Sequence, residues 1–447
     1  MKQLLSIIAL SCTMTASAQT YTLEQLKDSA LQNNIAIRHA KHMVDAAQQQ
    51  RKEAFTKYFP NVSSTGLWFN ANKGMAQTEL NLSEQITPEL GMALSQSLPA
   101  EALAALGNPI SVSMMKNGAV AGVTAVQPVF AGGQIVNGNR LAKVGEDVSR
   151  LQLQLSQNEV EKQTEQYYWQ LVSLQQKMNT IEAVQALLAD IYKDVDVAVR
   201  AGVAMRNDLL QVQLRQNDVE SQKLKLQNGI DILRLLLGQY CGLSNTSFAI
   251  EHSTLNIEHA NEAANIQSSI FNVQCLPEYQ LLNKQVEATK LQTKMEIGKN
   301  LPTLGVGAGY NYHNLLDKNH TFGMVFATVS VPISDWWGGS HAIKRRKIAQ
   351  QQAEEQLADN SELLKIRMQN AWNNVKEASQ QLQIAQRSIE QAEENLRVNR
   401  DYYRAGTSKM SDLLQAQLLY QQAQDSFTDA YADYQNKLLE YRQAIGQ

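Results

Sequence analysis

The sequence predicts an internally duplicated protein that is mainly α-helical with a small β part. Long proline-free stretches in which apolar residues recur every seven positions predict long, supercoiled helices. Short segments in which apolar residues alternate with small or polar ones predict strands. Of the 447 residues, 8 are proline and 6% are aromatic, and such a composition favours long helices.

The duplication is carried by two matching segments that lie 204 residues apart. Residues 200–202 and 404–406 both read Arg-Ala-Gly. Six residues after each glycine the sequence Asp-Leu-Leu-Gln begins, at Asp208 in the first segment and at Asp412 in the second, so the offset of 204 holds without a gap over the whole stretch. Because self-similarity at a fixed offset is typical of repeated structural units, the sequence predicts two copies of one unit.

Prolines extend the match toward the N-terminus and reveal an additional segment in the first copy. Pro128 and Pro332 are also 204 residues apart, whereas Pro60 and Pro302 are 242 residues apart. The first copy is therefore the longer one between its two prolines, and the additional residues fall at 73–118.

Each repeat is expected to run helix, strand, loop, strand, long helix, glycine turn and helix. The first repeat covers residues 19–242, with its helical turn near residue 202. A linker at 243–272 leads to the second repeat at 273–447, with its turn near residue 406.

The N-terminus predicts export from the cytoplasm. Lys2 is followed by a short apolar stretch, Leu4–Leu10, and then by the small residues Ala16–Ala18. This order is typical of a secretory signal peptide, which we assign to residues 1–18. Lipidation at Cys12 is disfavoured because Leu10 is one position away from where a lipobox requires it.

The long helices are predicted by a narrow apolar seam. In residues 341–403 one series recurs every seven positions and is accompanied by small residues three positions later: Val375, Leu382, Ile389, Leu396 and Tyr403, with Ala378, Ala385 and Ala392. A strict seven-residue repeat predicts left-handed supercoiling. Residues 134–200 carry a similar seam. Such helices suit both the wall of a hollow tube and an antiparallel coiled coil in water, and periodicity does not separate the two.

Strands are predicted after Pro302 and in three further segments, 62–70, 119–126 and 321–331. From Leu304 to Tyr312 every second residue is apolar or aromatic, and glycine or asparagine lies between. This alternation is typical of transmembrane β-strands, and the alternative is a small soluble sheet.

The predicted strands constrain how the protein could enter a membrane. No stretch beyond the leader has 18 consecutive apolar residues. Four strands are too few to close a barrel around a channel, and an open sheet edge cannot face lipid. Several chains would have to pool their strands, and three chains would supply twelve. Trp336 and Trp337, at the junction of strand and helix, suit an anchoring position at the membrane interface.

Other chemistry is disfavoured by the sequence. The net charge of −3 lacks the basic excess typical of nucleic-acid binding. No Ser-His-Asp signature, phosphate-binding loop or Cys-x-x-Cys is present, and His39 and His42 have no further ligand at suitable spacing. We therefore expect no enzymatic activity, no cofactor and no metal. Cys241 and Cys275 are either bridged or remain two separate thiols.

These features together resemble the TolC-like outer membrane efflux proteins. The resemblance rests on the duplicated order of elements, the prolines before the strands, the Gly-Gly pairs after each returning strand and the two Arg-Ala-Gly turns. It implies a homotrimer in the outer membrane of a Gram-negative bacterium, with a 12-stranded β-barrel (four strands per protomer) continued by a long periplasmic α-helical barrel. Residues near 240–275 and the C-terminus would form a mixed belt around the middle of the helical barrel, and segment 73–118 would be extracellular.

The resemblance also implies the function of an exit duct for drugs, metals or proteins in a tripartite efflux pump or a type I secretion system. The duct would open when a periplasmic adaptor and an inner-membrane pump dock at the helical tips. The residues at these tips are Arg200, Gly202, Asp208, Arg404 and Gly406. The arginines could bridge tip carboxylates or simply be solvated cations at helix C-termini.

A periplasmic gate is expected on the return helix of the second hairpin. Asp412 matches the first of two acidic positions that constrict the aperture in the family, but Gln415 occupies the second. Lys409 is a neighbour and not an aligned equivalent of the family's basic residue. Capping of the helix is an alternative role for Asp412, compatible with gating. An alternative for the whole chain is a soluble periplasmic coiled-coil adaptor or scaffold.

Overall fold

The computed structural model describes residues 20–80, 110–243, 248–251, 272–315 and 318–446, together with residues 87, 88, 90, 92 and 99. The chain forms two compact units. The helical unit comprises residues 1–48, 144–287 and 352–447, and the strand-containing unit comprises residues 49–143 and 288–351. Each unit draws on both of the predicted repeats.

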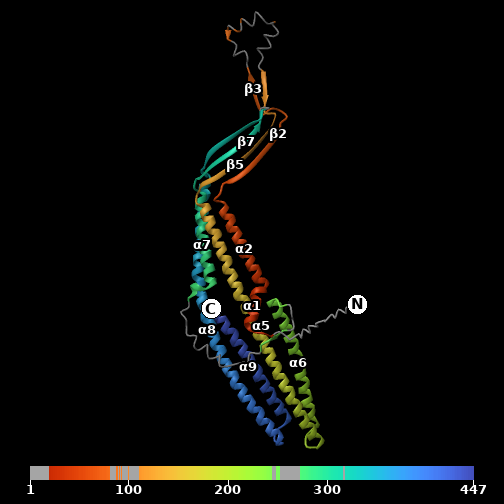
Figure 1. Cartoon of the computed structure of the whole chain (residues 1–447). Coiled ribbons are helices and arrows are strands. Elements are labelled where there is room, and N and C mark those ends of the chain that lie inside the picture. The colour runs from red at the N-terminus through yellow and green to blue at the C-terminus, as the bar shows by residue number, and fades with distance from the viewer. Residues whose placement is uncertain are drawn as a thin grey trace, which may run out of the picture. The chain divides into compact units, whose positions relative to one another are not determined.

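A four-stranded antiparallel sheet dominates the strand-containing unit (Figure 1). Its order is β2 (Asn61–Asn70), β5 (Asn117–Ala131), β7 (Thr303–Asn314) and β8 (His320–Ser330). All four strands predicted from the sequence are therefore present. Among the described residues β2 and β8 each pair on one side only, so the sheet has two open edges.

The additional segment of the first repeat leaves the sheet between β2 and β5. It contains β3 (Ala76–Leu80) and β4 (Ile110–Met114), which form a separate antiparallel pair among the described residues. Most of the residues from 81 to 109 lie outside the described residues, as do the signal peptide, Cys12 and most of the 243–272 linker.

The predicted alternation along β7 is confirmed. Leu304, Val306 and Tyr310 are exposed, at 40%, 47% and 63%, whereas Gly305 and Gly307 on the opposite face are buried. Gly307 pairs with Phe326 of β8, and a Cβ at Gly307 would overlap the Phe326 ring. Glycine is thus required on this face because an aromatic side chain from the neighbouring strand covers it.

The turn from β5 into the following helix depends on close backbone packing. Gly132 and Gly133 have φ values of +60° and +74°, a left-handed conformation that favours glycine. A Cβ on Gly132 would overlap the carbonyl group of Gly298. The second Gly-Gly pair differs, because residues 338–339 lie within the first turns of a helix. Residues 331–334 make the connection from β8 in that repeat, so its longer loop needs no left-handed reversal at the glycines.

Two long helical hairpins dominate the helical unit (Figure 1). The first is formed by α5 (Gln134–Arg200) and α6 (Arg206–Cys241), and the second by α8 (Asp335–Arg404) and α9 (Met410–Ala444). Both α5 and α8 begin in the strand-containing unit. No helix in the described part of the chain has the length and apolar character needed to cross a membrane.

Shorter elements complete the helical unit. They are β1 (Thr20–Tyr21), α1 (Leu23–Asn33), the first part of α2 (Ile35–Thr56), β6 (Ala249–Ile250), a 3-10 helix (Val273–Cys275) and the start of α7 (Pro277–Lys299). β1 and β6 pair in parallel, and α1 packs against α6. Residues of α2 and α7 beyond 48 and 287 belong to the strand-containing unit.

The predicted seven-residue seams form the cores of the helical unit. Val375 and Leu382 of α8 are 1% and 2% exposed, and Val212 and Val219 of α6 are fully buried. A first cluster joins α1, α5, α6, α8 and α9, and a second one lies toward the hairpin turns. The second cluster consists of Ile181, Val184, Leu188, Ile191, Val195, Val212, Val219, Leu396, Met410, Leu413 and Ala416. Burial of one narrow stripe per helix explains why the other faces are rich in glutamine, glutamate and lysine.

Candidate functional site

The turn of the first hairpin is a glycine-terminated helix end. Gly202 has a φ of +75°. Its N–H donates to the carbonyl of Val199 at 3.0 Å, and the N–H of Val203 donates to the carbonyl of Ala198 at 2.9 Å. These two bonds form a Schellman motif, which satisfies carbonyls that the end of a helix leaves free.

The turn of the second hairpin repeats this geometry 204 residues later. Gly406 has a φ of +72°, and its N–H donates to the carbonyl of Tyr403 at 3.0 Å. The N–H of Thr407 donates to the carbonyl of Tyr402 at 3.0 Å, as Val203 does in the first turn. Apart from the adjacent residues of the chain, no atom of the described residues lies within 4 Å of the position that a Cβ would occupy on Gly202 or Gly406, so glycine is needed for its backbone conformation and not for space.

The aspartate after each turn caps the return helix. Asp208 accepts a hydrogen bond from the backbone N–H of Met205 at 3.2 Å. Asp412 accepts one from the N–H of Lys409 at 3.3 Å and another from the hydroxyl of Ser408 at 3.3 Å. A carboxylate in this position satisfies a free N–H and is favoured by the positive end of the helix dipole. The capping role considered for Asp412 is therefore present in the structure.

The expected gate residues share the solvent side of the first turns of α9. Asp412 and Gln415 are both exposed, whereas the intervening Leu413 and the following Ala416 are buried in the second cluster. Three residues apart on a helix, Asp412 and Gln415 lie on one face. Lys409 is also exposed, and its contribution to the cap is its backbone N–H.

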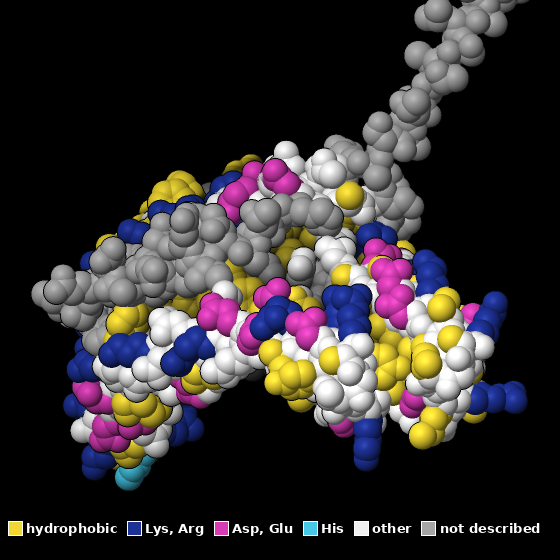
Figure 2. Space-filling model, turned by 90° about the horizontal axis from the view of Figure 1, so that it is seen from below, with side chains coloured by type: hydrophobic (Ala, Val, Ile, Leu, Met, Phe, Trp, Pro, Cys, Tyr) yellow, Lys and Arg dark blue, Asp and Glu magenta, His cyan; other side chains and the backbone are white. Residues whose placement is uncertain are grey.

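The two tip arginines have different partners. Arg200 pairs with Asp196 of its own helix at 2.8 Å. Arg404 reaches Asp194 of the other hairpin at 3.9 Å. Both arginines are largely exposed, so each pair contributes at most about 1 kcal/mol. Seen from below, basic and acidic side chains of the molecule are interspersed with hydrophobic ones (Figure 2).

A polar clamp between α6 and α9 was not predicted from the sequence. Arg215 donates to Gln417 at 3.1 Å and to Gln421 at 2.7 Å, and Gln421 in turn donates to Gln222 at 2.9 Å. Gln417 is fully buried, and burial lowers the pKa of Arg215. Because glutamine is abundant throughout α6 and α9, composition and spacing give no signal that singles out these residues.

A second polar contact joins α5 to α9. Lys177 pairs with Asp429 at 2.7 Å, and the hydroxyl of Ser173 donates to Asp429 at 3.1 Å. One turn earlier on α9, the Oδ1 atom of Asp425 is buried and has no hydrogen-bond partner among the residues that the structure describes. Burial raises the pKa of Asp425, whereas the charge of Lys177 lowers it.

The cysteines do not form the disulfide that the sequence left open, since both are free thiols. Cys241 is fully buried against the first cluster, whereas Cys275 is exposed at the end of the short 3-10 helix. Burial raises the pKa of Cys241 to about 12, which disfavours the reactive thiolate. His39 and His42 are exposed on α2, and no group of three or more metal-binding side chains occurs within the described ranges.

Comparison with solved structures identifies the fold. The chain is similar to the outer membrane protein VceC from Vibrio cholerae, with 14% identity, a TM-score of 0.74 and coverage of 95% of this chain and 96% of that one. It is also similar to the Campylobacter jejuni CmeC outer membrane channel (14% identity, TM-score 0.73, coverage 95% and 85%). A third match is the open state of the Neisseria gonorrhoeae MtrE outer membrane channel (13%, 0.70, 95% and 88%).

Comparison with protein families identifies the C-terminal part of the chain. Residues 278–447 match the family described as outer membrane efflux protein. None of the curated proteins compared with the sequence matches it. The matched family and structures are outer membrane proteins, in agreement with the localisation expected from the sequence. Residues 278–447 thus match the outer membrane efflux protein family, and the chain has the fold of the TolC-like outer membrane channels.

Proposed function

We propose that this chain is the protomer of an outer-membrane exit duct that serves a tripartite efflux pump or a type I secretion system. It conducts substrates passively from the periplasm to the exterior and catalyses no reaction. The observation that carries the proposal is the four-stranded sheet, which has two open edges and one exposed apolar face, in a chain with an efflux protein domain.

The open edges support a homotrimer. Val325 and Val329 of β8 are 87% and 68% exposed, and they share a face with Val306 and Leu304 of β7. An exposed apolar face of this kind suits lipid, but lipid does not tolerate the unpaired backbone groups of β2 and β8. Pairing β8 of one copy with β2 of the next removes both edges, and three copies give a closed barrel of twelve strands.

The two hairpin turns are the proposed docking sites for a periplasmic adaptor, which couples the duct to an inner-membrane pump. The turns have the same hydrogen bonds, so they present two equivalent backbone shapes to a partner. The exposed Asp412 and Gln415 are the proposed constriction, with a single charged ring in the trimer because Gln415 is neutral.

Single-channel conductance in planar bilayers tests both proposals. Asp412→Asn removes the charge but keeps an oxygen that can accept the Lys409 N–H, so the cap is retained. Asp208→Asn is the matched control, because Asp208 caps the equivalent helix of the first repeat. We expect trimer-sized conductance steps for all three proteins, with altered cation block or conductance for Asp412→Asn alone.

The other outcomes separate the parts of the proposal. If all three proteins show equal conductance and equal cation block, the proposed duct is retained, but Asp412 is not the constriction. The proposed duct would be contradicted if the detergent-folded protein never inserts into bilayers and the protein in cells fractionates with the soluble periplasm. The chain would then be a soluble coiled-coil adaptor or scaffold.

A further inference from the structure

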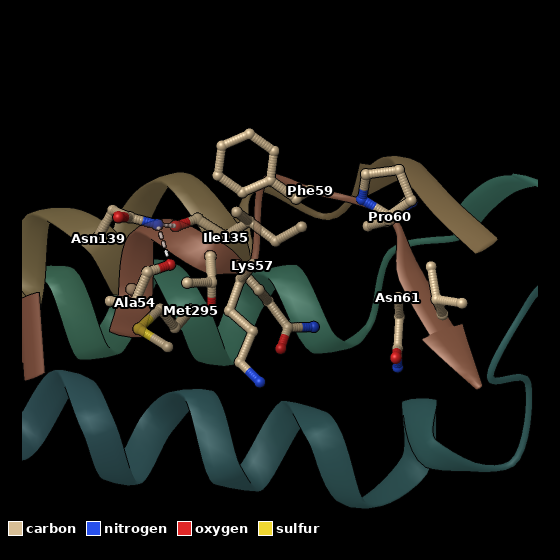
Figure 3. A pocket seen from close by; sticks show the side chains of 13 residues that line it. Ala54, Lys57, Phe59, Pro60, Asn61, Ile135, Asn139 and Met295 are labelled. Atoms are coloured by element: carbon tan, nitrogen blue, oxygen red, sulfur yellow. Dashed lines mark hydrogen bonds between the residues drawn. The ribbon is translucent and has the colours of Figure 1, made fainter. Parts of the chain in front are cut away.

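A cavity of about 700 Å³ lies in the strand-containing unit where β2 begins. It is lined by the end of α2, the residues that lead into β2, the start of α5 and Met295 of α7. In Figure 3 the rings of Phe59 and Pro60 lie on one side of the cavity, while the side chain of Lys57 extends toward the other. Phe59 is 56% exposed and Val62 is 64% exposed, so apolar surface is uncovered around the opening.

The cavity adjoins an edge strand, and strand direction determines which part of a second copy would meet it. Neighbouring strands of the sheet are antiparallel, so β2 and β8 run in opposite directions. If β8 of another copy pairs antiparallel with β2, its last residue, Ser330, arrives next to the first residue of β2, Asn61. The residues that follow Ser330 in that copy then lie at the mouth of the cavity.

That following segment, residues 331–337, carries apolar side chains that its own chain leaves uncovered. Val331, Ile333 and Trp337 are 41%, 63% and 80% exposed. Trp336 differs, because its indole N–H donates to the carbonyl of Asn300 of the same chain at 3.0 Å. Trp337 is therefore the large side chain available to a partner.

Charge on the two surfaces is complementary. Lys57 lines the cavity, and Asp335 lies in the first turn of α8 between Ile333 and Trp337. Both side chains are exposed, and neither has an ion-pair partner in the part of the chain that the structure describes. Lys57 precedes β2 by about as many residues as Asp335 follows β8, which brings them to the same level once the strands pair.

We propose that the cavity formed by residues 54–62 and 134–139 is a socket for a second copy of this chain. Trp337 and Ile333 of the neighbouring protomer fill the socket, and Asp335 of that protomer pairs with Lys57 beside it. The proposal rests on the homotrimer proposed above. It assigns Trp337 to the contact between subunits and not to the lipid interface, where the sequence had suggested an anchoring role.

Cysteine cross-linking tests the proposal directly. The full-length protein is prepared with the exposed Cys275 replaced by serine, and it carries Phe59→Cys together with Trp337→Cys. The matched control combines Phe59→Cys with Trp336→Cys, since Trp336 is held by its own chain. Mild oxidation of detergent-folded protein should convert the Trp337 pair into covalent dimers and trimers on denaturing gels, with several-fold less product for the Trp336 pair.

A charge exchange provides a second readout. Lys57→Glu and Asp335→Lys should each lower the temperature at which the trimer dissociates, and the double variant should recover most of the loss. Purely additive losses in the double variant would contradict the ion pair. Two results with an intact trimer would overturn the socket. One is equal cross-linking by the two cysteine pairs. The other is a spin label at position 337 whose accessibility to oxygen is as high as that of a lipid-facing site. Absence of any trimer in the unmodified protein would instead overturn the proposed duct.

Discussion

At the scale of single residues, two aspartates one helical turn apart on α9 differ in burial and in pairing, although both lie near Lys177. Asp429 is paired with Lys177, whereas Asp425 has a buried oxygen without a partner and a raised pKa. A carboxylate with a raised pKa binds its proton more tightly in the folded protein than in the unfolded chain. Its ionisation therefore costs stability at every pH above the usual aspartate range.

We predict that Asp425→Asn raises the unfolding temperature of the helical unit at pH 7. The gain should shrink as the pH falls toward about 3.9, where aspartate in the unfolded chain becomes protonated. Thermal unfolding followed by circular dichroism between pH 3.5 and 7 measures this trend. Asp429→Asn is the control and should lose up to about 1 kcal/mol at pH 7, as for a partly exposed ion pair. A loss of stability in both variants would contradict the conclusion that ionised Asp425 destabilises the folded protein.

The turn residues were predictable at this scale, but the clamp was not. Gly202, Gly406, Asp208 and Asp412 stand out because the sequence repeats and because left-handed turns and helix starts have strong residue preferences. Arg215 gives no such signal, since its glutamine partners come from another hairpin. Long-range contacts between polar side chains depend on how the helices dock, and a single sequence does not encode that docking in local spacing.

The hydrogen bonds of the clamp predict that loss of Arg215 weakens the packing of α6 against α9. Arg215→Met removes the donor to Gln417, whose buried side chain is then left with an unsatisfied oxygen at a cost of about 1–3 kcal/mol. Hydrogen exchange along α9 near residues 417–421 should become faster. Lys223→Met is the matched control on the same helix, because Lys223 contacts Gln185 and Glu182 of α5 and leaves α9 untouched. Unchanged exchange in Arg215→Met would show that the clamp contributes nothing to helix docking.

At the scale of elements, glycines within two helices differ in the space that is available for a side chain. A Cβ on Gly145 of α5 would have no atom within 4 Å, whereas a Cβ on Gly298 of α7 would overlap the carbonyl oxygen of Gly132. Alanine is the better helix former, so any cost at Gly298 comes from the backbone contact and not from helix propensity.

We therefore predict opposite signs for two identical substitutions. Gly145→Ala should stabilise the protein by about 0.5–1 kcal/mol. Gly298→Ala should destabilise it by about 1–3 kcal/mol, because the crowded backbone has to shift. Denaturant unfolding monitored by helical circular dichroism measures both. Stabilisation by Gly298→Ala would mean that α7 and the turn before α5 are not packed as closely as the structure has them.

The elements themselves were largely predictable because their signals are local. The limits of α5 follow from the absence of proline and from the glycine turn, and the faces of β7 follow from alternation of residue size. The two Gly-Gly pairs look alike in sequence, yet Gly132 and Gly133 adopt a left-handed turn and the pair at 338–339 does not. The length of the connection between strand and helix decides this difference. That length could not be predicted, because the sequence marks the ends of strands only weakly.

At the scale of the whole molecule, compact units and sequence repeats divide the chain differently. Each repeat contributes a strand pair to one unit and a helical hairpin to the other, so neither repeat buries its apolar surfaces alone. A seven-residue apolar seam does not identify the helix against which it packs. Open sheet edges likewise do not show how many copies of the chain are needed to close a barrel. The proposed number of subunits therefore rests on the resemblance and on barrel geometry.

The inserted segment should be separable from this architecture. Pairing between β2 and β5 ends at Asn70 and Asn117, and just beyond it the N–H of Ala71 donates to the carbonyl of Lys116 at 2.7 Å. The two chain ends are thus already adjacent, and in the described part of the chain β3 and β4 form a pair separate from the four-stranded sheet. Replacing residues 73–114 by a short glycine-containing turn should leave the sheet and its edges unchanged.

We predict that this deletion variant still forms trimers that resist dissociation as the full chain does, while its single-channel conductance changes if the segment covers the mouth of the pore. Gel mobility of unheated samples measures assembly, and planar bilayers measure conductance. A shorter connection also suits the second hairpin, where β7 and β8 are joined by residues 315–319 without an insertion. Loss of the trimer on deletion would show that the segment itself contributes to contacts between subunits, and the barrel could then not be assigned to the four sheet strands alone.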